Sequence, residues 1–159
     1  AFAHFRALAA PGARLIFSCF RARSENEWAL AITPILDRFV PAVLAGPAPP
    51  VGPFAFADPD RVSGILTKAG FAAPQMDPFD FDFVTGGGDD PVADSVSFFR
   101  RIGPFAALIR ELDTARAAEA VDQIAGLSAE HRVGDTVRFR AAAWLVSSKA
   151  AQPELRPIG

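Results

Sequence analysis

The 159-residue sequence contains no Tyr, one Cys, one Met and only two His. Because Cys19 has no partner in the chain, no internal disulfide can form, which fits a reducing compartment and makes the cytoplasm the expected location. No run of Lys and Arg exceeds two residues and the net charge is −2, so the electrostatic signature of a nucleic-acid-binding protein is missing. No apolar run approaches the ~20 residues of a membrane-spanning helix. We therefore expect neither nucleic acid nor a membrane as a partner.

The sequence offers few residues for metal binding or for covalent and acid–base catalysis. His4 and His131 have no Cys or carboxylate at ligand spacing, so we predict two ordinary surface residues and no metal site. Cys19 stands in an apolar run without a nearby His, which predicts a buried small side chain rather than a nucleophile. The absence of Tyr argues against a nicotinamide-dependent reductase, whose commonest chemistry uses that residue. No catalytic residue is assigned.

What the chain does contain is hydrophobic: half of its residues, including 15 Phe, with 21% charged. This composition predicts a folded chain with a core, and the length fits one domain. Residues 2–9 show helical spacing and run into the turn Pro11-Gly12. Leu15, Ile16 and Phe17 follow without alternation, which predicts a strand over 14–20 that is covered on both faces. Such a strand needs neighbours on both edges, and the residues before it cannot supply one.

Further elements follow from caps and periodicity. We expect a helix over 24–40, capped by Ser24 and interrupted by Pro34, and then a Pro-rich packed loop over 41–57. Asp58-Pro59 begins a helix that Gly70 ends. Phe/Asp alternation over 75–84 predicts an edge strand with one wet face, and the triplet Gly86-Gly87-Gly88 reads as a flexible connector rather than a phosphate loop.

The last third is expected to hold three helices and one strand. The helices begin at Asp90, Gly103 and Asp113, and Gly126 is expected to stop the third. A strand from 136 to 148 starts with alternation and ends apolar on both faces, so we place it between the other two strands and antiparallel to both. The tail from 153 to 159 is expected to fray.

This arrangement resembles the C-terminal half of class I S-adenosylmethionine-dependent methyltransferases, in particular the small-molecule branch that includes the ubiquinone and menaquinone biosynthesis enzymes. Four segments carry the resemblance: Phe5–Phe17, with Ala13 where the family's turn usually has a second Gly, and Cys19–Trp28, Gly52–Phe71 and Ala143–Val146. The implied fold class is α/β, the C-terminal part of a Rossmann-like methyltransferase sheet, with three strands, a terminal antiparallel hairpin-like pair and flanking helices. Residues 1–159 would form one partial domain with helical cap segments at about 24–40 and 91–126.

The resemblance implies a methyltransferase that acts on a small molecule with S-adenosylmethionine as cofactor and no metal. The family's cofactor motifs would lie upstream of residue 1, so this chain is expected to hold no cofactor-binding residue, to bind the cofactor weakly and to be inactive alone. For the substrate we single out Phe20, Trp28 and Phe56 as the lining of an apolar pocket, although each alone is more typical of a core. Arg21 follows the carboxyl end of the first strand, where open α/β sheets bind ligands, and could contact a substrate anion.

A second interpretation is a non-enzymatic α/β interaction module. The chain lacks an initial Met and begins inside a helical pattern, so we interpret its N-terminus as cut or unresolved and not as the natural start. Strand 14–20 would then expose an edge, and either self-association through that edge or a missing N-terminal half is expected to cover it.

Overall fold

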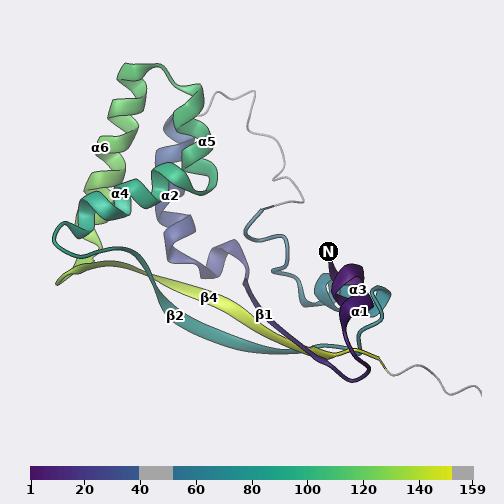
Figure 1. The fold of residues 1–159 in the computed structure, drawn as a ribbon. Coiled ribbons are helices and arrows are strands. Elements are labelled where there is room, and N and C mark those ends of the chain that lie inside the picture. Colours follow the sequence, from purple (N-terminus) through teal and green to yellow (C-terminus); the bar gives the residue numbers. More distant parts are fainter. Residues whose placement is uncertain (40–51, 152–159) are drawn as a thin grey trace, which may run out of the picture.

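The structure is a computed structural model that describes residues 1–39 and 52–151 (Figure 1). Its centre is an antiparallel sheet of four strands, β1 (Arg14–Phe20), β2 (Gln75–Gly87), β3 (Arg132–Val133) and β4 (Thr136–Lys149). β4 lies between β1 and β2 and is antiparallel to both, as the apolar character of its second half predicts. The expectation of three strands was incomplete, because the two-residue β3 forms a tight hairpin with the start of β4.

Six α-helices accompany the sheet. They are α1 (Phe2–Leu8), α2 (Glu27–Phe39), α3 (Pro59–Lys68), α4 (Pro91–Arg101), α5 (Gly103–Glu111) and α6 (Thr114–Glu130). The predicted caps are confirmed for three of them: the carboxylates of Asp58, Asp90 and Asp113 accept backbone N–H groups at the starts of α3, α4 and α6. Gly70 follows α3 with a φ of +88°, the left-handed conformation expected of a glycine after a helix.

Four sequence expectations about element boundaries were wrong. Arg23–Glu25 form a 3-10 turn, so α2 begins at Glu27 and not at Ser24. Pro34 lies inside α2 without interrupting it, and α6 continues past Gly126 to Glu130. Gly86 and Gly87 are not a loop, because they pair with Val137 and Thr136 at the end of β2. For Gly86 and Gly87, pairing with β4 outweighs the local preference of glycine for a loop.

Gly86 in β2 has no side chain where the backbone of α4 packs against the strand. A Cβ on Gly86 would lie 2.1 Å from the carbonyl oxygen of Pro91 and 2.5 Å from the backbone nitrogen of Ser95. Buried hydroxyls join the same elements: Ser95 Oγ lies 2.8 Å from Thr85 Oγ1 and 3.0 Å from Ser128 Oγ. The start of α4 therefore rests directly on the backbone of β2 and is fixed to α6.

Two hydrophobic clusters use opposite faces of the sheet. In the first, Phe139 and Ala141 of β4 pack with α2, α4, α5 and α6. In the second, Val146 of β4 packs with α3 and with Phe2 of α1. Odd-numbered side chains of β4 thus pack in the first cluster and even-numbered ones in the second, because successive side chains of a strand point to opposite faces. Twisting of the long strands turns the sheet between its ends, which is why both helical groups stand above it in Figure 1.

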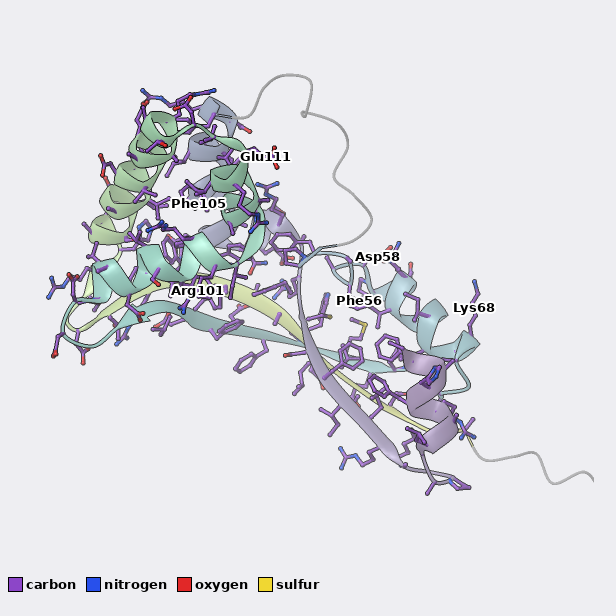
Figure 2. All side chains as sticks on the ribbon, turned by 45° about the horizontal axis from the view of Figure 1, so that its top comes forward. Phe56, Asp58, Lys68, Arg101, Phe105 and Glu111 are labelled. Carbon is purple, nitrogen blue, oxygen red and sulfur yellow. The ribbon has the colours of Figure 1, made fainter. Side chains whose placement is uncertain are left out.

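The Pro-rich segment connects the two groups. Its described part packs as expected of a packed loop: Phe54 joins the first cluster and Phe56 the second. Figure 2 shows Phe56 beside the α1 and α3 end of the molecule, away from Phe105 in the larger helical group. The remaining predictions for 41–51, for the end of the helix at residue 40 and for the tail 153–159 concern residues outside the described ranges.

Candidate functional site

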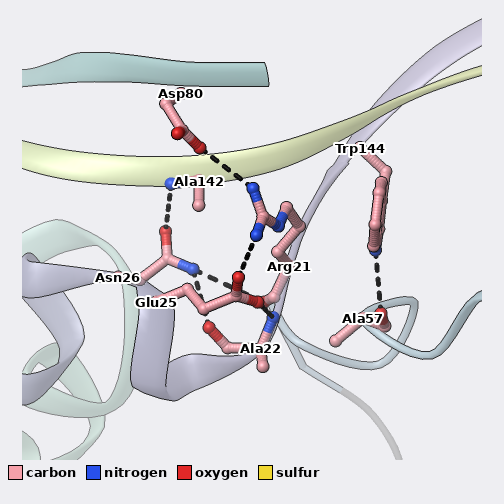
Figure 3. A network of polar contacts seen from close by, with 8 residues as sticks. All are labelled: Arg21, Ala22, Glu25, Asn26, Ala57, Asp80, Ala142 and Trp144. Carbon is pink, nitrogen blue, oxygen red and sulfur yellow. Dashed lines mark hydrogen bonds and ion pairs between the residues drawn. The ribbon is translucent and has the colours of Figure 1, made fainter. Parts of the chain in front are cut away.

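The turn that follows β1 supplies side chains where the sheet has a gap. β1 and β3 pair with the two ends of one edge of β4, leaving the middle of that edge without a strand. There the backbone N–H of Ala142 donates to Asn26 Oδ1 at 3.1 Å, and that of Arg140 donates to a Glu27 carboxylate oxygen at 2.7 Å. Figure 3 shows the Asn26 amide held between this edge and the carbonyl of Ala22, 3.0 Å away. Two side chains at the start of α2 therefore take the place of a strand.

Arg21, one of the predicted site residues, already has its charge paired with carboxylates of the protein. Its guanidinium forms ion pairs with Glu25 and, at 3.0 Å, with Asp80 of β2, and it lies 5.2 Å from the ring centre of Trp144 (Figure 3). The two carboxylates compete with any substrate anion for the guanidinium. An anion at this position would have to displace one of them.

Phe20 and Trp28 come together as the sequence analysis expected. The ring centres of Phe20 and Trp28 are 5.4 Å apart, and Phe54 lies 5.9 Å from the first and 5.6 Å from the second. Phe54 was not among the predicted substrate-binding residues. These three rings, the aromatic triad, come from β1, α2 and the loop before α3.

An apolar cavity lies on each side of the aromatic triad. The outer cavity, of about 590 Å³, lies over the sheet and is lined by Ser18, Cys19, Phe20, Pro53, Phe56, Phe79, Phe81, Ala143, Trp144 and Leu145. The inner cavity, of about 710 Å³, lies against α2 and the start of α5, and its apolar walls include Trp28, Ile32, Leu36, Pro53, Phe54 and Pro104. Both volumes fall in the range of roughly 300–1,000 Å³ typical of small-molecule sites.

The four predicted substrate-binding residues do not share one cavity. Phe20 and Phe56 line the outer cavity and Trp28 lines the inner one. Arg21 lines a third, open and strongly charged hollow of about 980 Å³ with acidic residues of α2 and β2. The structure thus places these residues near one another around the carboxyl end of β1, in three adjacent spaces.

His131 was predicted as an ordinary surface residue, but it is half-buried. Its ring stacks on Phe139 at 4.2 Å, its Nδ1 lies 3.0 Å from the carbonyl oxygen of Leu127, and its Nε2 lies 3.7 Å from Glu27. The sequence marks Asn26 and Glu27 only as part of a helix start and of the segment Cys19–Trp28 that carries the resemblance. No spacing in the sequence pairs residues 26–27 with residues 131–142, so their contacts could not have been found without the fold.

Cys19 is half-buried, whereas the sequence predicted a buried side chain. Its Sγ lies 3.4 Å from the carbonyl oxygen of Phe56, and burial raises the pKa of the thiol above its usual value. Within residues 1–39 and 52–151, no three His, Cys, Asp or Glu side chains are grouped so that they could hold a metal ion. In the same ranges no helix is both long and apolar enough to cross a membrane.

Comparison with known proteins adds no relative. No protein-family model matches the sequence, and no curated protein is significantly similar to it.

Proposed function

We propose that this chain is the C-terminal half of a class I S-adenosylmethionine-dependent methyltransferase that acts on a small apolar molecule. The observation that carries the proposal is the strand order β1-β4-β2, with the last strand inserted antiparallel between two strands that run the same way. The resemblance to the methyltransferases rests on this same expected arrangement of strands. The order of a helix, a Pro-Gly turn and a strand at the start of the chain, followed later by the helix from Pro59 to Lys68, also supports the proposal.

The chain's own residues would form the acceptor side of the enzyme. Two apolar cavities meet at the aromatic triad beside the carboxyl end of β1, where open α/β sheets bind ligands. Methyl transfer needs proximity and alignment more than a dedicated base, so a site made of rings and aliphatic side chains is sufficient for the protein's part. The cofactor, held by residues outside this chain, would supply the methyl group.

The coding sequence upstream of Ala1 is the sharpest test. We expect an apolar strand followed by a Gly-rich loop about a hundred residues earlier, and a protein that includes both should transfer a labelled methyl group from S-adenosylmethionine to small aromatic acceptors. Titration calorimetry of residues 1–159 alone should show no tight binding of the cofactor. Micromolar binding by this chain would contradict the assignment of the cofactor site to an upstream half.

A second candidate function is supported by the edge position of β1. Among the described residues β1 pairs with β4 alone, and Ile16 on this strand is 54% exposed. An unpaired edge with apolar side chains favours pairing with another strand, so the alternative is an interaction module that associates through residues 14–20. Light scattering of residues 1–159 at high concentration should then show a dimer, and a clean monomer would count against this alternative.

A further inference from the structure

We propose that the ring of Phe54 determines the length of the apolar ligand that this protein accepts, because it closes the passage between the inner and outer cavities. This inference deepens the proposed function, on which it rests only for the identity of the ligand as a methyl acceptor. Its physical content is that the two cavities are one ligand site, and that Phe54 is the removable part of the aromatic barrier between them.

The two cavities meet at the aromatic triad. Pro53 lines both of them. Phe20 faces the outer cavity, whereas Trp28 and Phe54 face the inner one, and all three ring centres lie within 5.9 Å of one another. The barrier between the cavities is therefore the contact of Phe20, on the outer side, with Trp28 and Phe54, on the inner side.

Phe54 is the member of the triad whose side chain can be truncated with the least disturbance of the fold. Phe20 belongs to β1, where its backbone is in register with Ala143, and Trp28 is buried in α2 within the first cluster. Phe54 is half-buried and stands on the loop from Gly52 to Ala57. This loop is fixed just beyond Phe54, since Trp144 Nε1 donates to the carbonyl of Ala57 at 2.9 Å (Figure 3). Truncating Phe54 should thus open the barrier while the loop keeps its position.

Small and large apolar side chains alternate across the sheet beneath the outer cavity. Ala143 of β4 is in register with Phe20 on one side and with Phe79 on the other, so a methyl group lies between two rings on the same face of the sheet. Leu145 is 45% exposed and continues this apolar floor. This apolar floor offers contacts to an alkyl chain.

Charge is confined to the rim of the inner cavity. Its lining includes Arg23, Asp58 and Arg61, which are all exposed, whereas the lining of the outer cavity contains no charged residue. The ligand class is therefore an apolar molecule with a polar group at one end, and the polar group remains at the inner rim.

A chain-length series tests this directly on residues 1–159. The neutral dye N-phenyl-1-naphthylamine, which fluoresces in apolar sites, would be displaced by primary n-alkanols from butanol to dodecanol. In the wild-type protein each added methylene should raise affinity about fourfold until the chain reaches the barrier, after which affinity should level off. In Phe54→Ala the plateau should begin at least two methylenes later, which raises affinity for the longest alkanols about fifteenfold or more.

Phe98→Ala is the matched control. Phe98 is also half-buried and also packs against the first cluster, but it lines neither cavity. Its removal should leave the plateau at the wild-type chain length. If Phe54→Ala is not folded by circular dichroism, Phe54→Val should show the same shift over a shorter distance.

The results separate this inference from the proposed function. A plateau that is unchanged in folded Phe54 variants, or that shifts equally in Phe98→Ala, overturns the role of Phe54. Absence of dye binding overturns it as well, because the cavities would then be closed to ligands. A shifted plateau in a protein whose upstream sequence lacks the Gly-rich loop would retain the role of Phe54 and reject the methyltransferase assignment.

Discussion

Asn26→Ala should destabilise this protein more than any exposed change in the same turn. Asn26 is fully buried, and its Oδ1 accepts the N–H of Ala142, which is also buried. Its amide nitrogen donates to the carbonyl of Ala22 at 3.0 Å and, more weakly, to that of Arg21 at 3.4 Å. The side chain thus completes the edge of β4 and ties the turn after β1 to it.

The cost can be worked out from these bonds. Ala22 is exposed, so water can solvate its carbonyl in the variant, but the N–H of Ala142 would be left buried without an acceptor. Leaving one buried group unpaired costs about 1–3 kcal/mol, and losing the bond to Ala22 adds about 1 kcal/mol. We therefore expect the free energy of unfolding to fall by about 2–4 kcal/mol, which corresponds to roughly 4–16 °C in melting temperature for a domain of this size.

Urea unfolding followed by tryptophan fluorescence measures the effect. Trp28 lies in the helix that Asn26 precedes, and the absence of Tyr leaves the emission to the two Trp residues. Ser24→Ala is the control, because Ser24 is exposed in the same turn and should change stability by less than about 0.5 kcal/mol. A loss below about 1 kcal/mol for Asn26→Ala would refute the view that this side chain replaces a strand.

Three further outcomes are expected. Gly86→Ala should cost about 1–3 kcal/mol in thermal unfolding, because its Cβ would meet the backbone of α4, whereas Gly64→Ala, with open space around it, should be neutral or stabilising by up to about 1 kcal/mol. Cys19 should react with Ellman's reagent far more slowly than free cysteine at pH 8 and faster as pH rises, since a raised pKa leaves less thiolate; a rate equal to that of free cysteine would show that burial does not protect it. Trp144→Phe removes the hydrogen bond to Ala57, so limited proteolysis within 52–57 should become faster, and an unchanged cleavage rate would contradict an anchoring role.

Much of the fold could be predicted because its signals are local. Asp at a helix start binds the N–H groups of its own first turn, so the caps of α3, α4 and α6 were found from two or three adjacent residues. The period-two pattern of Phe and Asp identified β2, and the Pro and charges on it correctly indicated an edge strand. The central place of β4 followed from its change from half-wet to fully apolar.

The site was predicted only in part, because its geometry joins distant segments. Phe20 and Trp28 are eight residues apart and do contact each other, but Phe54, which completes the triad, is not singled out by the sequence as a substrate-binding residue. Phe56 points to the other cluster, although it is only two positions away. Residues 52–56 form turns, so Phe54 and Phe56 reach different clusters, and no periodicity in the sequence indicates this.

The sequence by itself determined most of the segments that become helices and strands, where most helices begin, and that one strand must lie inside the sheet. These properties depend on caps, turns and hydrophobic periodicity within a few residues. The tertiary structure alone decided that Asn26 and Glu27 complete the edge of β4, that Gly86 belongs to a strand beneath a helix, and that the apolar space is divided in two at Phe54. The physical reason is that unpaired backbone groups and cavities exist only once segments far apart in the chain are packed together.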